Sequence, residues 1–381
     1  MAAVTPIEPL TQIAPASLRP AVVAVPVRVT RPAAKPKKKL VRRVGRDISQ
    51  QLRHGFQVAF LLLNVWIGAE FYLWVRGYEL GRPVAFGRPA GVDGWLPISG
   101  LMNLEYWLEA ERVPRVHPAA LFLLLAFLAI AFLVRKAFCS WLCPIGTISE
   151  SLWRLGRKLF RRNLAPPRWL DLPLRGLKYL LLAFFVGVVA LMPAAQIREF
   201  MHAPFGLIAD VKMLDFFRTI GETGLIILAV LVLGSLVVKN FWCRYLCPYG
   251  GLLGLVALAS PARIRRTPEL CIDCGKCAKA CPAHLPVDRL AAVHSAECTA
   301  CLECVAVCPA EGALDMTIAS LPGVKRAERR LPAWAVAAAV AAIWLGMVGY
   351  AKFSGHWQTN VPAAVYQQLV PHADQATHPM P

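Results

Sequence analysis

The sequence predicts an all-α integral membrane protein of about five transmembrane helices, built from an internal repeat and carrying a small cysteine-rich α+β domain toward its C-terminal end. Its 381 residues are 57% apolar and only 17% charged, and the mean hydropathy is +0.49. This composition is too apolar for an ordinary soluble domain. All 12 cysteines fall into four tight motifs, which favours metal ligands over a disulfide framework.

Five apolar runs are long enough, or nearly so, to cross a hydrocarbon core of about 30 Å, which takes roughly 17–25 helical residues. They are residues 56–75, 118–134, 179–195, 223–238 and 331–351. The fourth has 16 residues, and its helix is expected to extend into the flanking residues. Residues 1–55 are expected to form a basic, disordered cytoplasmic arm, because the first 46 positions contain seven prolines and the run Lys37, Lys38, Lys39.

The distribution of Lys and Arg predicts the orientation of these helices. With the N-terminus inside, the inner segments 1–55, 135–178 and 239–330 contain 33 basic residues and the outer segments contain 9. The asymmetry predicts a multi-pass protein of the cell inner membrane, with the N-terminus and the cysteine-rich domain in the cytoplasm and residues 352–381 as a periplasmic tail. The net charge of +19 is therefore an orientation signal, and no nucleic-acid partner is expected.

Residues 56–260 are predicted to be a four-span membrane domain made of two parallel repeats. The segments FCSWLCPIG (138–146) and WCRYLCPYG (242–250) lie 104 residues apart, and each follows an apolar run and a basic residue. An amphipathic helix on the inner leaflet should follow the first segment, with Thr147 and Glu150 at the spacing of a capping box. Residues 252–259 are apolar but too short to span, so they are expected to be interfacial or re-entrant.

Two tandem C-x2-C-x2-C-x3-C-P runs predict a domain with two 4Fe–4S clusters over residues 262–322. In such runs the fourth cysteine ligates the other cluster. One cluster is therefore expected on Cys271, Cys274, Cys277 and Cys308, and the second on Cys298, Cys301, Cys304 and Cys281. The competing zinc ribbons use paired C-x2-C units with longer gaps, and lack the third cysteine and the Cys-Pro step.

The remaining cysteines form two C-x3-C-P motifs, whose i,i+4 spacing places each pair on one helix face. Two pairs at equal depth on pseudo-symmetric helices can converge on a third metal site or a redox-active thiol group, and neighbouring basic residues would favour thiolates. The alternative is that they act as small apolar residues at the membrane interface. The sequence leaves the metal open. The four residues are Cys139, Cys143, Cys243 and Cys247.

These motifs resemble those of the NosR/NapH/CcoG-type membrane polyferredoxins. The resemblance rests on the two nine-residue segments, the tandem cysteine runs and the loop residues 88–98 and 117–119; it covers about residues 50–360 and is strongest toward the C-terminal half of NosR. It implies membrane electron transfer, since NapH-type relatives pass electrons from quinol toward periplasmic nitrate reductase and CcoG-type relatives assist copper insertion. NosR carries a flavin-binding domain before its first span; this chain has 55 basic residues there, so no flavin is expected.

The predicted function is that of an electron carrier or oxidoreductase subunit of anaerobic respiration, in contact with membrane lipid. It would relay electrons between a quinol or cytoplasmic donor such as a ferredoxin and a periplasmic respiratory reductase or its maturation system. The alternatives are a copper-handling assembly factor that uses the C-x3-C-P thiols, and a structural docking anchor. Glu70, inside the first span, is a candidate for quinone or proton chemistry, with snorkelling to the interface as the alternative.

Three histidines on the outer side, at positions 117, 202 and 356, are candidate ligands for copper or haem. Isolated histidines are more often simply polar. No C-x-x-C-H motif occurs in the sequence, so covalent c-type haem is not expected.

Overall fold

The computed structural model describes residues 41–378, apart from 44, 46, 83–84 and 319–328, so most of the predicted basic arm lies outside the described residues. The first half of the described chain contains α1 (Ser49–Glu79), η1 (Ala90–Trp95), α2 (Pro97–Ala110), α3 (Pro118–Val134), α4 (Phe138–Trp141), α5 (Pro144–Phe160), α6 (Arg168–Ala190) and α7 (Ala194–His202). The second half contains α8 (Pro204–Leu207), α9 (Ala209–Arg218), α10 (Glu222–Val237), α11 (Phe241–Tyr245), α12 (Pro248–Leu258), β1 (Ala262–Arg266), α13 (Lys276–Ala280), α14 (Glu303–Ala306), β2 (Leu314–Ile318), β3 (Arg329–Arg330), α15 (Ala333–Phe353), α16 (Ala363–Leu369) and η2 (Val370–Gln375).

All five predicted apolar runs form helices, namely α1, α3, α6, α10 and α15. Among the described residues, three helices (α1, α6 and α15) are long and apolar enough to cross a membrane, or four if α9 and α10, bent by 83°, count as one span. The predicted count of five is therefore higher than length and composition support. Helix α3 accounts for much of the difference, because its 17 residues reach only about 26 Å at 1.5 Å per residue.

Helix α3 forms the centre of the helical bundle. Most of its side chains are buried, and it packs against α2, α12, α15 and η1. Helices α1 and α10 instead present exposed apolar side chains such as Leu62, Trp66 and Ile226, as lipid-facing helices do. The apolar sequence of α3 is therefore in contact mainly with protein, at the lower limit of the length that a membrane span needs.

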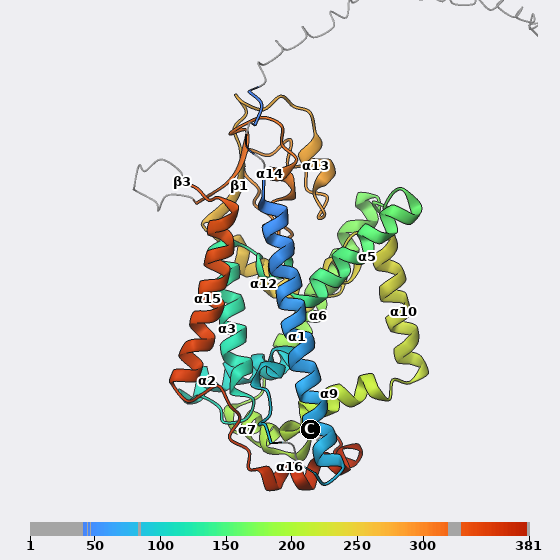
Figure 1. Ribbon diagram of the computed structural model, residues 1–381, viewed down its shortest axis with the longest axis vertical. Coiled ribbons are helices and arrows are strands. Elements are labelled where there is room, and N and C mark those ends of the chain that lie inside the picture. Colours follow the sequence, from blue (N-terminus) through green and yellow to red (C-terminus); the bar gives the residue numbers. More distant parts are fainter. Residues whose placement is uncertain (1–40, 44, 46, 83–84, 319–328, 379–381) are drawn as a thin grey trace, which may run out of the picture. The chain divides into compact units, whose positions relative to one another are not determined.

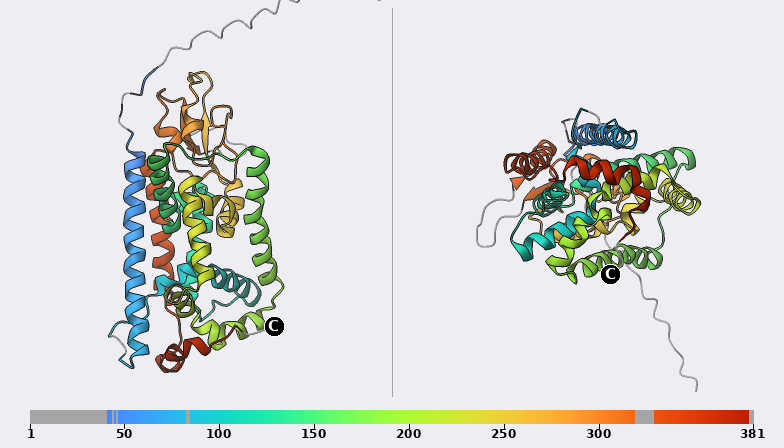
Figure 2. Two further views of the ribbon diagram at one scale, coloured as in Figure 1. Left: turned by 90° about the vertical axis from the view of Figure 1, so that its right-hand side faces the viewer. Right: turned by 90° about the horizontal axis from the view of Figure 1, so that it is seen from below.

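The cysteine-rich domain and helix α16 lie at opposite ends of the bundle (Figures 1 and 2). The domain is built on an antiparallel sheet in the order β1-β2-β3, with Ala262 opposite Ile318. The predicted domain 262–322 can be followed to Ile318, where the described chain breaks. Residues before α1 attach to the domain, since the Arg43 backbone N–H donates to the Pro309 carbonyl oxygen at 3.1 Å.

Helix α5 has the predicted amphipathic character but a different N-terminus. Its Ile148 and Leu159 side chains are exposed, whereas Gly156 lies so close to α10 that a Cβ would meet the Leu236 carbonyl oxygen at 1.7 Å. The predicted capping box is wrong, because Cys143 is the N-cap residue of α5 and the Glu150 carboxylate accepts a hydrogen bond from Arg53. The apolar run 252–259, expected to be interfacial or re-entrant, forms part of α12, which packs against α3 and α6.

Candidate iron–sulfur sites

The eight cysteines of the tandem runs gather around two separate cavities in the sheet domain. One cavity is lined by the distal set, which comprises Cys271, Cys274, Cys277 and Cys308. The other is lined by the proximal set, which comprises Cys281, Cys298, Cys301 and Cys304. Each set combines three cysteines of one run with the last cysteine of the other, which is the arrangement that the cross-ligation pattern predicts.

The two sets are held by equivalent backbone turns. Gly275 and Leu302 have left-handed φ angles of 67° and 58° and directly precede the short helices α13 and α14. Asp273 and Ala300, two positions earlier in each run, are also left-handed, with φ of 54° and 50°. These tight turns direct successive cysteines of a run toward one centre, so a close repeat in sequence becomes a repeat in local structure.

The cysteine sets fit 4Fe–4S clusters better than single ions. Within the described residues, no group of three or more Cys, His, Asp or Glu side chains could hold one metal ion. Around a single ion all thiolates lie about 2.3 Å from the same centre, whereas each cysteine of a cubane binds its own iron. Four converging cysteines that are too widely spaced for one ion are therefore consistent with a cluster.

The two sets differ in their access to solvent. Cys274 of the distal set is exposed, whereas Cys281 and Cys304 of the proximal set are buried. Cys301 also lines the large cavity that continues into the membrane domain. The distal set is therefore placed for contact with a soluble partner, and the proximal set for contact with the helical bundle.

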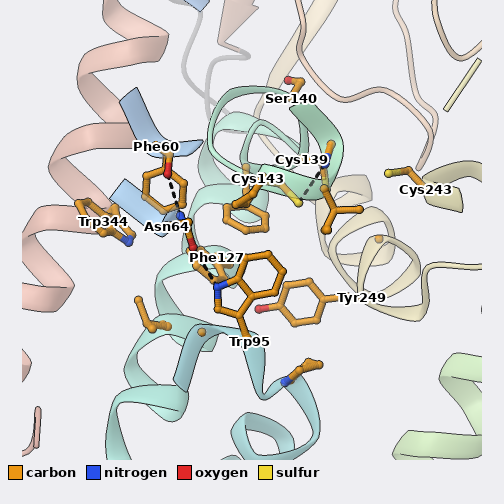
Figure 3. Close-up of a pocket in the computed structure, with 18 of the residues that line it drawn as sticks. Phe60, Asn64, Trp95, Phe127, Cys139, Ser140, Cys143, Cys243, Tyr249 and Trp344 are labelled. Carbon is orange, nitrogen blue, oxygen red and sulfur yellow. Dashed lines mark hydrogen bonds between the residues drawn. The ribbon is translucent and has the colours of Figure 1, made fainter. Parts of the chain in front are cut away.

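The four C-x3-C-P cysteines line one end of that large cavity, whose volume is about 680 Å³. Figure 3 shows Cys139, Cys143 and Cys243 there, with Trp95 and Asn64 further along. Cys139 and Cys143 of the first repeat and Cys243 and Cys247 of the second thus line the same cavity. A metal site shared by the two pairs stays a prediction. We refer to these four residues as the paired-motif cysteines.

The second cysteine of each motif caps a helix. The Sγ of Cys143 accepts the backbone N–H of Gly146 at 3.4 Å, and the Sγ of Cys247 accepts that of Gly250 at 3.2 Å. The following proline begins α5 or α12 in each case, where the missing N–H costs nothing. Both helix N-termini therefore point at the thiols, and their positive dipole ends favour thiolate over thiol.

Buried cations surround the paired-motif cysteines. Lys136 is 3% exposed; its ammonium donates to the Gly250 carbonyl oxygen at 3.2 Å and forms no salt bridge with any described residue. Lys178 is fully buried and pairs with Glu297 at 2.5 Å. Glu297 also attracts the Lys136 ammonium, so the two buried lysines share one carboxylate. This end of the cavity therefore carries more buried positive than negative charge among its lysines and Glu297, which suits an anionic ligand.

Hydrogen bonds tie the proximal set to the first paired motif. Ser140 Oγ donates to the Thr299 carbonyl oxygen at 2.6 Å, and Trp141 Nε1 donates to that of Ala300 at 3.1 Å. These two carbonyls belong to the residues that directly precede Cys301. The loop that carries a proximal cysteine is therefore attached to the helix that carries Cys139.

A buried arginine, which the sequence analysis did not single out, lies at the same junction. Arg53 is 1% exposed and forms salt bridges with Glu150 at 2.6 Å and Glu303 at 3.3 Å. Together with a hydrogen bond from Gln57, it holds the pKa of the Glu150 carboxyl at about 2 despite its burial. Since Glu303 immediately precedes Cys304, this ion pair connects α1, α5 and the proximal set.

The far end of the large cavity lies within the bundle and is mainly aromatic. Trp95 Nε1 donates to Asn64 Oδ1 at 3.0 Å, and Asn64 Nδ2 donates to the Phe60 carbonyl oxygen at 2.8 Å (Figure 3). Tyr249 and Glu70 also line this cavity. The intramembrane carboxylate that the sequence singled out therefore faces a cavity.

The three candidate histidines occupy different surroundings. His117 is fully buried, with Nδ1 3.0 Å from Asp93 Oδ1 and Nε2 3.1 Å from the Gly206 carbonyl oxygen. His202 is exposed on α7, and His356 contacts Ser354 Oγ at 3.2 Å. Because the described residues hold no group of three ligands for a single ion, the structure gives these histidines no common metal site.

An α-helical membrane bundle with three convergent sets of four cysteines defines a membrane-bound iron–sulfur protein. A family model described as "4Fe-4S binding domain" matches residues 116–163 and 220–267, two segments 104 residues apart, and one described as "4Fe-4S dicluster domain" matches residues 263–309. The duplication inferred from the sequence is thus confirmed. The first family model also includes all four paired-motif cysteines.

Curated relatives define the family more narrowly. YccM of Escherichia coli, named as a candidate electron transport protein, is 49% identical over 327 residues, which is 86% of this chain and 91% of that protein. The ferredoxin-type protein NapH of Haemophilus influenzae is 28% identical over 64% of this chain and 88% of its own. The regulatory protein NosR of Pseudomonas aeruginosa is 33% identical over 48% of this chain and 25% of its own.

The chain therefore belongs to the NapH/NosR-type membrane polyferredoxins, which are ferredoxin-type electron-transport proteins. The predicted family is confirmed, although YccM is more similar than NosR and matches far more of the chain. No solved structure matches it.

Proposed function

We propose that this protein relays electrons between a quinol or cytoplasmic donor and a periplasmic respiratory reductase or its maturation system. The observation that carries the proposal is the continuity of its three cysteine sets. The distal set reaches solvent at Cys274, the proximal set adjoins it, and Cys301 and the paired-motif cysteines line the same cavity. Clusters bound there would supply one-electron redox chemistry. The Lys/Arg asymmetry supports an inner-membrane orientation with the sheet domain in the cytoplasm.

The distal and proximal sets are proposed to hold one 4Fe–4S cluster each, and the paired-motif cysteines a third. Two observations support the third cluster over copper. The first is the description of the family model that spans both motifs. The second is that two buried ammonium groups, those of Lys136 and Lys178, share the single carboxylate of Glu297, and an anionic thiolate-ligated cluster would balance the excess positive charge. A copper-handling role would call for thiolates that meet at one ion, and the described residues contain no such group.

The large cavity is proposed to admit the quinol headgroup. Its volume of about 680 Å³ lies within the range of about 300–1,000 Å³ typical of small-molecule sites. Aromatic side chains from Phe127, Trp95 and Trp344 would contact the ring, and the amide of Asn64 would orient a ring oxygen. Oxidation of quinol releases two electrons and two protons. Glu70, at the cavity wall, would accept one of those protons.

Metal content tests the cluster assignment. Full-length protein purified without oxygen should contain about twelve iron and twelve acid-labile sulfide if three cubanes are present, and about eight of each if only two are. In the double variant Cys139→Ser/Cys247→Ser we expect about four fewer of each, with the spectra of the other two clusters unchanged. A wild-type content of about eight that this variant does not alter would refute the third cluster.

Reduction kinetics test the quinol site. A short-chain quinol added to the oxidised holoprotein should reduce the clusters, and Asn64→Leu should slow that reduction at least tenfold. Dithionite, which needs no binding site, should reduce wild type and variant at equal rates. Clusters that are reduced by ferredoxin but not by any quinol would reject the quinol donor, and clusters inert to every donor would indicate a structural anchor.

A further inference from the structure

A second cavity, of about 220 Å³, opens at the end of the bundle opposite the sheet domain. It lies between α2, residues 112–116 and α7. It is separate from the large cavity, because the two share no lining residue. Nothing in the electron-transfer role described above makes use of it. Its polar lining residues are Asn103, Tyr106, Arg112, Arg115, Arg198 and His202.

All the charged side chains that line this cavity are basic. No acidic residue lines it, and Arg112, Arg115 and Arg198 form no salt bridge with any described residue. Other arginines at this end of the bundle behave differently: Arg218 pairs with Glu79 at 2.6 Å, and Arg88 pairs with Asp210 at 2.6 Å. Three exposed arginines that line one hollow without a lining carboxylate form a surface suited to an oxyanion.

A buried acceptor faces the same cavity. Asn103 is fully buried, and its amide nitrogen donates to the carbonyl oxygens of Val116 at 3.2 Å and His117 at 2.9 Å. These two bonds fix the orientation of the amide, so its Oδ1 points away from the two carbonyl groups. This oxygen has no hydrogen-bond partner within the described residues. Because buried acceptors are nearly always satisfied by protein or by water, this oxygen is available to a hydroxyl donor that enters the cavity.

The cavity lies beside exposed apolar side chains near the end of a candidate membrane-spanning helix. Helix α2, which forms one wall, packs against the end of α6, one of the helices long enough to cross a membrane. Leu191, directly after α6, is 86% exposed, and Leu108 on α2 is 62% exposed. Large exposed apolar side chains beside free guanidinium groups are typical of the boundary between acyl chains and phosphate headgroups.

The geometry points to a binding site for a phosphate ester that carries a free hydroxyl, the chemistry that phosphatidylglycerol and glycerol phosphate share. The phosphate would pair with Arg112, Arg115 and Arg198, and a glycerol hydroxyl would donate to Asn103 Oδ1. The exposed leucines nearby, Leu108 on α2 and Leu191 after α6, favour the lipid over the soluble ester as the natural occupant. The site is independent of the proposed clusters and quinol cavity.

Binding by the detergent-solubilised, full-length holoprotein tests this site. Dioctanoyl phosphatidylglycerol should bind at least tenfold more tightly than dioctanoyl phosphatidylcholine, whose choline group has no hydroxyl and carries a positive charge. The variant Arg112→Gln/Arg115→Gln/Arg198→Gln should lose at least tenfold in affinity for phosphatidylglycerol. Arg82→Gln, at an exposed arginine that does not line the cavity, is the matched control and should bind as wild type does. Unchanged cluster absorption in each variant would verify the fold.

Two soluble probes identify the source of the ligand. Glycerol phosphate that competes with the lipid supports the shared headgroup chemistry, and lipid binding at least tenfold tighter than glycerol phosphate assigns the site to the membrane. Equal affinity of the two would assign it to the soluble ester. Equal binding of the two lipids, or an affinity for phosphatidylglycerol that the triple variant leaves unchanged, would overturn the proposal.

Discussion

Replacing Arg53 by Gln should lower the free energy of unfolding by about 3 kcal/mol. The ordinary pKa of Glu150 is 4.5, and in the folded protein it is held at about 2. That difference is worth about 3 kcal/mol at 1.36 kcal/mol for each tenfold change in proton affinity, and Arg53 is its largest favourable cause, ahead of Gln57 and Arg154. It agrees with the roughly 3–5 kcal/mol lost when one partner of a buried ion pair is removed. With a urea dependence of about 2 kcal/mol per M, the unfolding midpoint should fall by about 1.5 M.

The effect should depend on pH in a defined direction. Because the folded-state pKa of Glu150 is lowered, its contribution is fully present above pH 4.5 and disappears as the pH falls toward 2. The difference between wild type and Arg53→Gln should therefore be largest near neutral pH and shrink through that window. Urea unfolding of the apoprotein, followed by tryptophan fluorescence at several pH values in one detergent, measures it, because the acid-labile clusters do not survive this window.

Arg154→Gln is the matched control. Arg154 also contacts Glu150 and Glu303, at 2.7 and 2.6 Å, but its side chain is 32% exposed. Solvent screens such a pair, so its loss should cost at most about 1 kcal/mol. Equal effects of the two substitutions, or a midpoint for Arg53→Gln within about 0.3 M of wild type, would refute the reasoning that burial makes Arg53 the stabilising partner.

Three further outcomes are expected. Cys308→Ser should perturb the electron paramagnetic resonance signal of the cluster on the distal set and spare the proximal one, although Cys308 belongs to the same sequence run as three proximal cysteines; the opposite result would reject cross-ligation. Gly146→Ala should remove about four iron atoms, because the new Cβ would lie 2.2 Å from the Cys139 carbonyl oxygen. Gly250→Ala should keep them, because its Cβ would have its nearest contact at 3.6 Å. Equal iron content in the two variants would contradict this reasoning. A reporter fused to the C-terminus should be active only in the periplasm, and cytoplasmic activity would require an even number of spans.

Local sequence patterns were sufficient for the cysteine chemistry and for most of the helices. The two- and three-residue gaps between cysteines limit which thiols can reach the same cluster, because so short a stretch of backbone can adopt few conformations. The left-handed turn before each short helix, at Gly275 and Leu302, repeats with the same period as the cysteines. The 104-residue repeat likewise predicted that Cys139 and Cys143 lie close to Cys243 and Cys247, because duplicated helices related by a pseudo-two-fold bring equivalent positions together, and all four line one cavity.

Some predictions from the sequence were incomplete because they treated each segment alone. Residues 118–134 have the composition of a membrane span, but α3 is enclosed by other helices, and hydropathy cannot distinguish lipid from protein as the apolar neighbour. Thr147 and Glu150 have the spacing of a capping box, but the Cys143 thiol takes the cap and Arg53 takes the carboxylate.

The sequence by itself determined the class of protein, the cysteine sets and the helical repeat, because these depend on spacing and composition within short stretches of chain. Only the tertiary structure decided which charges are buried and what they meet. Arg53 lies 97 residues from Glu150 and 250 from Glu303, and Lys136 lies 114 residues from the carbonyl it contacts. In the sequence these cations look like the many others that mark the inner face of a membrane protein. Packing removes them from water, and only then does their charge need a partner.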